Sequence, residues 1–359
     1  MAEITLKKNG LYQQDIKSIL NLNCDFLELK KKTILITGAT GLIGSVLVDM
    51  LVFLSKTYKL DLNLLLISRT AESRSEKFED TFIHHIKCDV ANENLTEKIP
   101  LYKKIDFIFH LASNTHPADY SKYPIETILT NFNGTKGLLD LASKNLPCQF
   151  MLASSVEVYG DDRQSLSDGF KESDFGYLDC NTMRACYNES KRISESLCQA
   201  YKAEKNCDVV IARIARSYGA TLKKNDTKAL SQFLRCGLNN ENIILKSSGK
   251  QFFSYIYSPD VACALIFLML KGKNGEAYNI ADENSNIQLK DLANLVAQNC
   301  NVKVVFDVPE ETEKAGYSKS VRAILNTGKI NVLGWSAQVR IEEGIKRTVE
   351  ILQDRNTSF

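Results

Sequence analysis

The sequence has little of what a zinc site or a membrane segment requires. Its four histidines and ten cysteines include no Cys-x-x-Cys pair, so the common zinc motifs are excluded and we expect no bound metal. The longest apolar run, residues 261–270, is far shorter than the roughly 20 residues of a membrane-spanning helix, which predicts a buried helix instead. The N-terminus lacks the apolar core that is typical of signal peptides.

A surplus of charge of either sign is also missing. The 45 basic side chains nearly balance the 43 acidic ones, and the net charge of +2 gives no electrostatic reason to expect binding to nucleic acid or to an anionic membrane. The scattered cysteines are typical of reduced thiols in a cytoplasmic protein. With 359 residues, 44% of them hydrophobic, the chain can form one large α/β unit or two lobes that share a cleft.

Strand-like and helical patterns alternate from residue 32 onward. This alternation predicts an α/β fold with a doubly wound parallel sheet and helices on both faces. We expect a dinucleotide-binding domain at 32–215 that also carries the catalytic residues, a mainly substrate-binding α/β lobe at 216–359, and a helical extension at 1–31. The apolar runs that predict the strands of the sheet are 33–37, 62–68, 82–88, 106–112, 149–155 and 208–214.

The pattern of the C-terminal part is less regular. Residues 216–260 are predicted to hold loops and one helix, at 228–238. A strand at 277–282, a helix at 287–298, a strand at 302–308 and a final helix at 341–353 are predicted to follow. We assign all of these elements to the smaller lobe, over the carboxyl edge of the sheet.

The first predicted strand runs directly into TGATGLIGS, which has the glycine spacing GxxGxxG. Glycines allow a tight turn and let a pyrophosphate approach the backbone, and the helix that follows offers free N–H groups. The motif stands between a strand and an amphipathic helix, which is the context of a Rossmann-type dinucleotide site. The loop residues that we assign to the cofactor are Gly38, Thr40, Gly41, Leu42, Ile43 and Gly44.

The end of the second strand bears on the identity of the cofactor. Ser68 and Arg69 stand where an NAD-selective site usually has an acidic residue that accepts from the ribose. Arg69 cannot accept a hydrogen bond but pairs well with a 2′-phosphate, so NADP(H) is favoured. NAD(H) stays open, with Arg69 as a solvated surface residue. Further residues that we assign to the cofactor site are Asp89, Val90, Leu111, Ala112, Ser113 and Asn131.

Tyr187 and Lys191 lie four residues apart in a stretch with helical periodicity, so their side chains share one helix face. An ammonium beside a phenol lowers the pKa of the phenol, which can then exchange protons near neutral pH. Together with the glycine motif and the serine at the end of the fifth strand, this pair indicates a dehydrogenase-type active site.

The motifs TGATGLIGS, HLAS, NFNGT, LASSVEVYGD, YNESK and IYSPD resemble the extended short-chain dehydrogenase/reductases that modify nucleotide sugars, from residue 32 onward. The nearest local resemblance is to UDP-glucuronate decarboxylases. The resemblance implies that Tyr187 is the acid/base for a sugar oxygen, that Ser155 hydrogen-bonds the same oxygen, and that Lys191 binds the nicotinamide ribose. It also implies a small-molecule nucleotide-sugar substrate and a homodimer. Residues predicted to bind the substrate are His116, Arg184 and Arg216.

Several positions depart from the pattern of this family. Val156 replaces the proton-donating Asp of the dehydratases, whereas Glu157 is kept, as in decarboxylases, and is a catalytic candidate. Phe253 replaces an arginine that grips the substrate, and Arg216 replaces an asparagine. We predict that Arg216 contacts a substrate phosphate or carboxylate, with pairing to one of the protein's own carboxylates as the alternative.

The favoured function is hydride transfer at C4 of a nucleotide-activated sugar, by an epimerase or a 4-keto reductase of surface polysaccharide synthesis. A UDP-glucuronate-type decarboxylase is one alternative, and an NADPH-dependent reductase of a sugar phosphate in an alditol pathway is another. A redox sensor or scaffold without enzymatic activity is disfavoured, because Ser155, Tyr187 and Lys191 are all present.

Overall fold

A seven-stranded parallel sheet forms the centre of the computed structural model, which describes residues 6–69, 82–92, 95–99, 104–115, 117–162, 166–307 and 322–354. Every neighbouring pair of its strands is parallel, which confirms the predicted Rossmann-type α/β fold. In sheet order the strands are β10 (Ala277–Ile280), β6 (Asp208–Ile214), β5 (Gln149–Ser155), β4 (Phe107–His110), β1 (Thr33–Thr37), β2 (Asn63–Ser68) and β3 (Ile83–Lys87).

Alternate residues of these strands point into two separate apolar cores. In β1, Ile34 and Ile36 belong to one core and Leu35 to the other. In β6, Val210 and Ile211 divide in the same way. Because successive side chains of a strand point to opposite faces, the sheet is buried on both sides, as apolar strands without polar alternation require.

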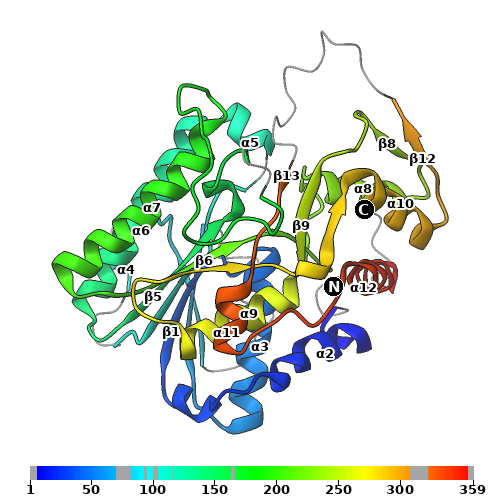
Figure 1. The fold of residues 1–359 in the computed structure, drawn as a ribbon. Coiled ribbons are helices and arrows are strands. Elements are labelled where there is room, and N and C mark those ends of the chain that lie inside the picture. The colour runs from blue at the N-terminus through cyan, green and yellow to red at the C-terminus, as the bar shows by residue number, and fades with distance from the viewer. Residues whose placement is uncertain are drawn as a thin grey trace.

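Helices pack in pairs against the two faces (Figure 1). The pair α6 (Pro124–Lys144) and α7 (Ala185–Lys205) contributes to one core, and the pair α3 (Leu42–Tyr58) and α9 (Ser258–Lys271) to the other. α9 contains the long apolar run, and its first twelve residues are all buried, so the predicted buried helix is confirmed. Among the described residues, no helix combines the length and apolar character needed to cross a bilayer. Shorter helices are α4 (Leu95–Lys98), α5 (Pro117–Lys122), α11 (Gly328–Leu333), η4 (Val156–Val158) and η5 (Glu283–Ser285).

The chain after residue 215 also builds a smaller group of elements beside the sheet (Figure 1). Its central strand is β9 (Phe252–Tyr257), which pairs with β7 (Arg216–Tyr218), β11 (Asn286–Gln288) and β13 (Arg322–Ala323). A second small sheet joins β8 (Ile243–Leu245) to β12 (Val304–Phe306). The helices of this lobe are α8 (Ala229–Leu238), α10 (Leu289–Cys300) and α12 (Ile341–Asp354), all close to their predicted ranges.

Two expectations for this part of the chain are corrected by the structure. The local pattern assigns the strand at 277–282 to the smaller lobe, whereas β10 pairs with β6 and forms one edge of the central sheet. The pattern of 216–260 predicts loops and one helix, whereas this stretch also contains β7, β8 and β9. Both errors have the same cause, because the pairing of a short strand depends on partners distant in the sequence.

The N-terminal segment is helical, as predicted, with α2 (Gly10–Lys17), η1 (Ser18–Asn21) and η2 (Phe26–Leu29). Its side chains form hydrogen bonds and an ion pair with both the central-sheet part and the smaller lobe. Tyr12 donates to Asp49 of α3 at 2.7 Å, and Asp15 accepts from Tyr257, at the end of β9, at 2.6 Å. Asp15 also pairs with Arg347 of α12 at 2.8 Å. The segment therefore links the glycine-loop helix to the smaller lobe.

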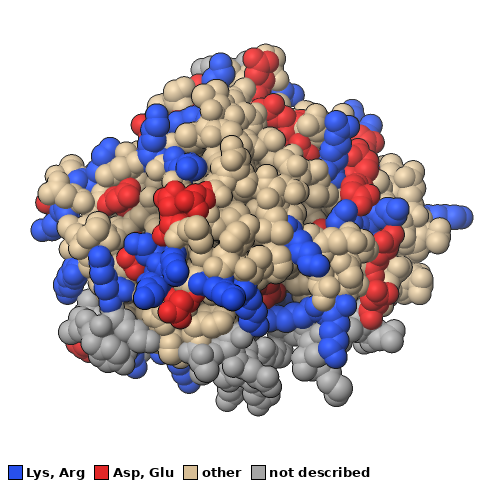
Figure 2. Space-filling view, turned by 90° about the horizontal axis from the view of Figure 1, so that it is seen from below, with Lys and Arg blue, Asp and Glu red and all other residues tan. Residues whose placement is uncertain are grey.

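The surface carries charges of both signs. Figure 2 shows Lys and Arg side chains interspersed with Asp and Glu side chains over the face viewed from below. This distribution agrees with the near-neutral net charge of +2. All ten cysteines are free thiols in the structure.

Candidate active site

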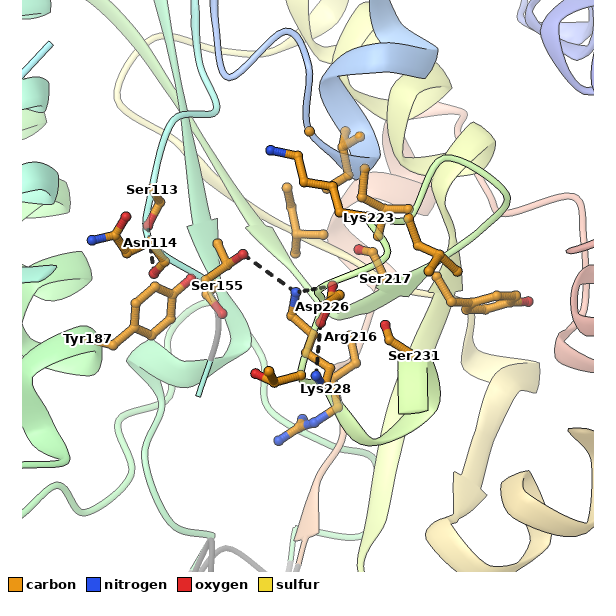
Figure 3. Close-up of a pocket in the computed structure, with 18 of the residues that line it drawn as sticks. Ser113, Asn114, Ser155, Tyr187, Arg216, Ser217, Lys223, Asp226, Lys228 and Ser231 are labelled. Carbon is orange, nitrogen blue, oxygen red and sulfur yellow. Dashed lines mark hydrogen bonds and ion pairs between the residues drawn. The ribbon is translucent and has the colours of Figure 1, made fainter. Parts of the chain in front are cut away.

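A cavity of about 1070 Å³ lies between the ends of the central strands and the smaller lobe. The glycine loop and the ends of β2, β4 and β5 line one part of it, and β7, β9 and α8 line the other. Figure 3 shows Tyr187 and Ser155 on the sheet side and Arg216 and Lys228 on the side of the smaller lobe. Ligand pockets usually measure about 300–1,000 Å³, so this cavity is at the large end of that range.

The glycine loop passes so close to other backbone that side chains do not fit. Gly38 has a φ of +70°, and a Cβ on it would lie 2.8 Å from the amide nitrogen of Ala112. A Cβ on Gly44 would overlap the carbonyl oxygen of Gly38 and lie 2.9 Å from its carbon. Gly41 is the N-cap of α3 and brings no side-chain hydrogen bond to it. The first turn of α3 is therefore open to an anion, as a pyrophosphate-binding loop requires.

All the other predicted cofactor residues except Asn131 also line the cavity. Arg69 is 65% exposed and pairs with Glu126 at 3.6 Å. Asp89 accepts from the amide of Ala91 at 3.0 Å, which fixes the turn after β3. The remaining members of this set on the wall are Thr40, Leu42, Ile43, Ser68, Val90, Leu111, Ala112 and Ser113.

Asn131 lies in α6, outside the cavity wall and 1% exposed. Its amide donates to Ser190 at 2.8 Å, and Ser190 in turn donates to the carbonyl of Tyr187 at the same distance. Asn131 therefore supports the helix turn that carries Tyr187, and it does not reach the cavity where it was predicted to bind the cofactor.

Tyr187 stands in the first turn of α7 and is 7% exposed. Burial raises the pKa of its phenol, whereas hydrogen bonds with the hydroxyls of Ser155 and Ser113 lower it. The ring of Tyr120 stacks on the Tyr187 ring at 4.7 Å and holds it in place. The structure thus brings together the predicted tyrosine and serine.

Lys191 lies one turn further along α7, with its Nζ 5.9 Å from the centre of the Tyr187 ring. The ammonium donates to the carbonyl of Ala153 at 2.8 Å. Burial lowers the pKa of Lys191 to about 8, and the charge of Glu195 counteracts this change. The predicted lowering of the Tyr187 pKa by Lys191 is wrong for this arrangement, because the ammonium is directed at a carbonyl and burial dominates at the phenol.

A buried ion pair lies behind Lys191. Glu195 of α7 binds Arg213 of β6 through two nitrogens, with Nη2 at 2.7 Å from Oε2 and Nε at 3.1 Å from Oε1. Ser154 donates to the same carboxylate at 2.5 Å. Arg213 also donates to the hydroxyl of Tyr159 at 3.0 Å. This network fixes α7 against the sheet and sets the position of the Tyr187 and Lys191 side chains.

Glu157 and Arg216 form an ion pair inside the cavity, 3.1 Å between Oε1 and Nη2. The guanidinium of Arg216 also lies over the Phe253 ring, 3.7 Å from its centre. Asn188 holds the second carboxylate oxygen of Glu157 at 3.3 Å. Of the two partners predicted for Arg216, the protein's own carboxylate is the one that it contacts in this structure.

Of the two other residues predicted to bind the substrate, the structure describes only one. Arg184 lines the cavity immediately before α7 and is exposed. His116 lies outside the described residues. Sequence analysis did not identify the ring of Tyr120 or the lysines of residues 222–228, LKKNDTK, as parts of the site. The grouping of these lysines is a pattern from which they could have been predicted. Lys228 lines the cavity, pairs with Asp226 at 3.2 Å and reaches Thr115 at 3.5 Å.

Comparison with known proteins gives one family match. The model of the NAD dependent epimerase/dehydratase family matches residues 34–281. UDP-glucuronic acid decarboxylase 6 of Arabidopsis thaliana is 31% identical over 317 residues, which cover 87% of this chain and 86% of that protein. UDP-glucuronic acid decarboxylase 1 of Danio rerio is 30% identical over 326 residues, which cover 90% of this chain and 73% of that protein.

Solved structures share the fold. UDP-glucose 4-epimerase of Thermotoga maritima with UDP-glucose superimposes with a TM-score of 0.76 at 23% identity, covering 89% of this chain and 98% of that one. dTDP-glucose 4,6-dehydratase of Bacillus anthracis in complex with NAD gives 0.74 at 20% identity, covering 89% and 96%. At these identities the likeness shows a common fold.

Proposed function

This chain belongs to the NAD dependent epimerase/dehydratase family, within the extended short-chain dehydrogenase/reductases, and on that basis we propose that it transfers hydride at C4 of a nucleotide-activated sugar. One observation carries the proposal. The Tyr187 phenol and the Ser155 hydroxyl lie next to each other where the cavity passes from the glycine loop to the smaller lobe (Figure 3). A sugar carbon held there has a proton acceptor beside its hydroxyl.

Tyr187 and Ser155 act on one sugar oxygen in this proposal. Tyr187 accepts the proton of a sugar hydroxyl, or returns it to a ketone, and Ser155 holds that oxygen in place. A dinucleotide whose pyrophosphate is held by the glycine loop would supply the hydride chemistry through its nicotinamide. Lys191, whose Nζ lies 5.9 Å from the centre of the Tyr187 ring, would bind the hydroxyls of the nicotinamide ribose.

We propose NADP(H) as the preferred cofactor. Arg69 lines the cavity at the end of β2, and its pair with Glu126 at 3.6 Å is open to water on both sides, with exposed fractions of 65% and 52%. Exposed pairs of this kind are weak, so the guanidinium can exchange Glu126 for a 2′-phosphate at little cost.

Decarboxylation of a UDP-glucuronate-type substrate is the second candidate. The named relatives at 30–31% identity are UDP-glucuronic acid decarboxylases, and Glu157 and Arg216 supply a carboxylate and a cation within the cavity. Both candidates include hydride transfer at C4. Val156 is buried and cannot donate a proton to a departing hydroxyl, which speaks against dehydration.

We also propose a homodimer in the cytoplasm, assembled through α6. The exposed side of this helix carries Ile125, Ile128 and Leu129, which are 73%, 41% and 44% exposed. Apolar side chains grouped in this way favour contact with another protein surface. Light scattering combined with gel filtration measures the mass in solution and decides between monomer and dimer.

Incubation with nucleotide-linked hexoses and uronic acids, followed by mass spectrometry, tests the reaction. An unchanged mass with inverted C4 supports an epimerase, and a gain of two hydrogens from NADPH supports a reductase. Loss of carbon dioxide from a uronic acid selects the decarboxylase. Loss of water from any hexose refutes the proposal, because Val156 leaves no donor for that step.

A further inference from the structure

Arg216 reaches the cavity from the side of the smaller lobe (Figure 3). It stands in β7, opposite Tyr255 of the parallel neighbour β9. This register brings its guanidinium to 3.7 Å from the centre of the Phe253 ring. Contact with an aromatic face restrains a guanidinium while its N–H groups stay free for hydrogen bonds along the edge. Two paired strands thus present a fixed planar cation to the cavity.

The hydrogen-bonding capacity of this cation is largely unused. Its Nη2 meets Glu157 at 3.1 Å, and its buried Nη1 has no hydrogen-bond partner among the described residues. A guanidinium carries five N–H donors, so a single carboxylate contact satisfies only part of it. The two side chains of the pair are 24% and 35% exposed. An ion pair that water can reach contributes little to stability, so Glu157 can be exchanged for another anion.

The pair also lies close to the residues that act on the sugar. Asn188 follows Tyr187 directly and donates to the backbone carbonyl of Glu157 at 2.8 Å and to its Oε2 at 3.3 Å. The amide of Glu157 also donates to the hydroxyl of Ser155 at 3.3 Å. An anion bound by Arg216 therefore lies near the group that Tyr187 deprotonates. Asn188 keeps hold of Glu157 when the guanidinium changes partner.

We propose that Arg216 determines specificity for an acidic sugar, its guanidinium binding a carboxylate on the sugar ring in place of Glu157. This inference rests on the proposed function, because it names the substrate class of the same site. A planar guanidinium matches the two oxygens of a carboxylate, which gives both strength and orientation. The ammonium groups of Lys223, Lys228 and Lys246, which also line the cavity, remain for the phosphates of the nucleotide.

Calorimetric titration of the full chain with UDP-glucuronate and with UDP-glucose tests this assignment. The native protein should bind the acidic sugar more tightly. Arg216→Gln should weaken UDP-glucuronate about tenfold or more, because a charge-assisted hydrogen bond is lost, and should change UDP-glucose less than about threefold. Arg216→Lys keeps the charge without the planar fork and should give an intermediate loss. Arg340→Gln removes an equal charge from an exposed position outside the cavity wall and should change neither affinity.

Two results would overturn the proposal. One is equal or weaker binding of UDP-glucuronate than of UDP-glucose by the native protein. The other is an equal loss for both sugars in Arg216→Gln, which is the pattern expected of a phosphate contact. Thermal unfolding of each variant shows that it is folded, and Arg216→Lys carries the test if the glutamine variant is not. A binding preference for the acid without hydride transfer to any sugar would refute the proposed function alone.

Discussion

Replacement of Gly44 by alanine should disturb the cofactor site and leave the rest of the fold intact. A Cβ at this position would overlap the carbonyl oxygen of Gly38 and lie 2.9 Å from its carbon, whereas ordinary contacts begin at 3.4 Å. Both obstructing atoms belong to the backbone, so relief requires the glycine loop itself to move. Overpacking of this kind costs about 1–3 kcal/mol. The displaced loop also loses its fit to a pyrophosphate.

The energetic cost of moving the loop sets the expected loss of cofactor affinity. About 1.4 kcal/mol corresponds to a tenfold change in affinity, so we expect the Kd for NADP⁺ to rise at least about tenfold in Gly44→Ala. Two matched variants calibrate this value. A Cβ on Gly41 would meet only the Gly38 oxygen at 3.2 Å, and a Cβ on Gly10 would meet nothing within 4 Å. Gly41→Ala should show an intermediate loss, and Gly10→Ala none.

Titration calorimetry gives the affinities, and thermal unfolding without cofactor gives the stabilities. The reasoning is refuted if Gly44→Ala binds NADP⁺ within threefold of the native protein while its loop stays folded. It is also refuted if Gly10→Ala loses cofactor affinity as strongly as Gly44→Ala does, because the loss would not depend on the contact with Gly38.

Three further predictions concern the cofactor and the acid/base. Arg69→Ala should weaken the binding of NADPH about tenfold or more, because a contact of ~1.5–3 kcal/mol is lost, and should change the affinity for NADH less than threefold. Equal affinities of the native protein for the two cofactors would contradict this prediction. Tyr187→Phe should abolish turnover, followed by nicotinamide absorbance, with the cofactor Kd unchanged; activity within threefold of native would assign the proton transfer elsewhere. Since burial lowers the pKa of Lys191 from 10.5 to about 8, its ammonium is lost as the pH rises through about 8. kcat/KM should fall there, whereas stability should rise towards pH 10.5, because the unfolded chain binds the extra proton; a flat rate profile to pH 10 would count against a role for the ammonium.

The parts of the fold that sequence pattern predicts are those with a local cause. Most strands of the central sheet are largely apolar runs, and the glycine loop stands between a strand and a helix with a spacing typical of dinucleotide sites, so both could be recognised. β10 is different. Its four residues, AYNI, are a plain strand pattern, and the partner that places them in the central sheet, β6, lies some sixty residues earlier in the chain.

The active site likewise combines relations set locally, which sequence predicts, with relations set by the whole fold, which it does not. The relation between Tyr187 and Lys191 is set by one helix turn, so it followed from spacing alone. The partner of Arg216 was left open, because Glu157 lies 59 positions away and comes near only when β5 pairs with β6, in the register that places Ser155 opposite Ile214. The direction of the Tyr187 pKa was wrong for a related reason: burial is a property of the whole fold, and it exceeds the effect of a neighbour on the same helix.

The N-terminal segment acts as a brace across the cleft. Tyr12 is bonded to the helix that begins at the glycine loop, and Asp15 to the strand and helix of the smaller lobe. A hinge motion that separates these two parts must break buried hydrogen bonds, each worth about 1 kcal/mol. The width of the cleft is therefore held from outside it, by residues that touch no ligand. Access to the cavity then depends on the loops that line it and not on the parting of two bodies.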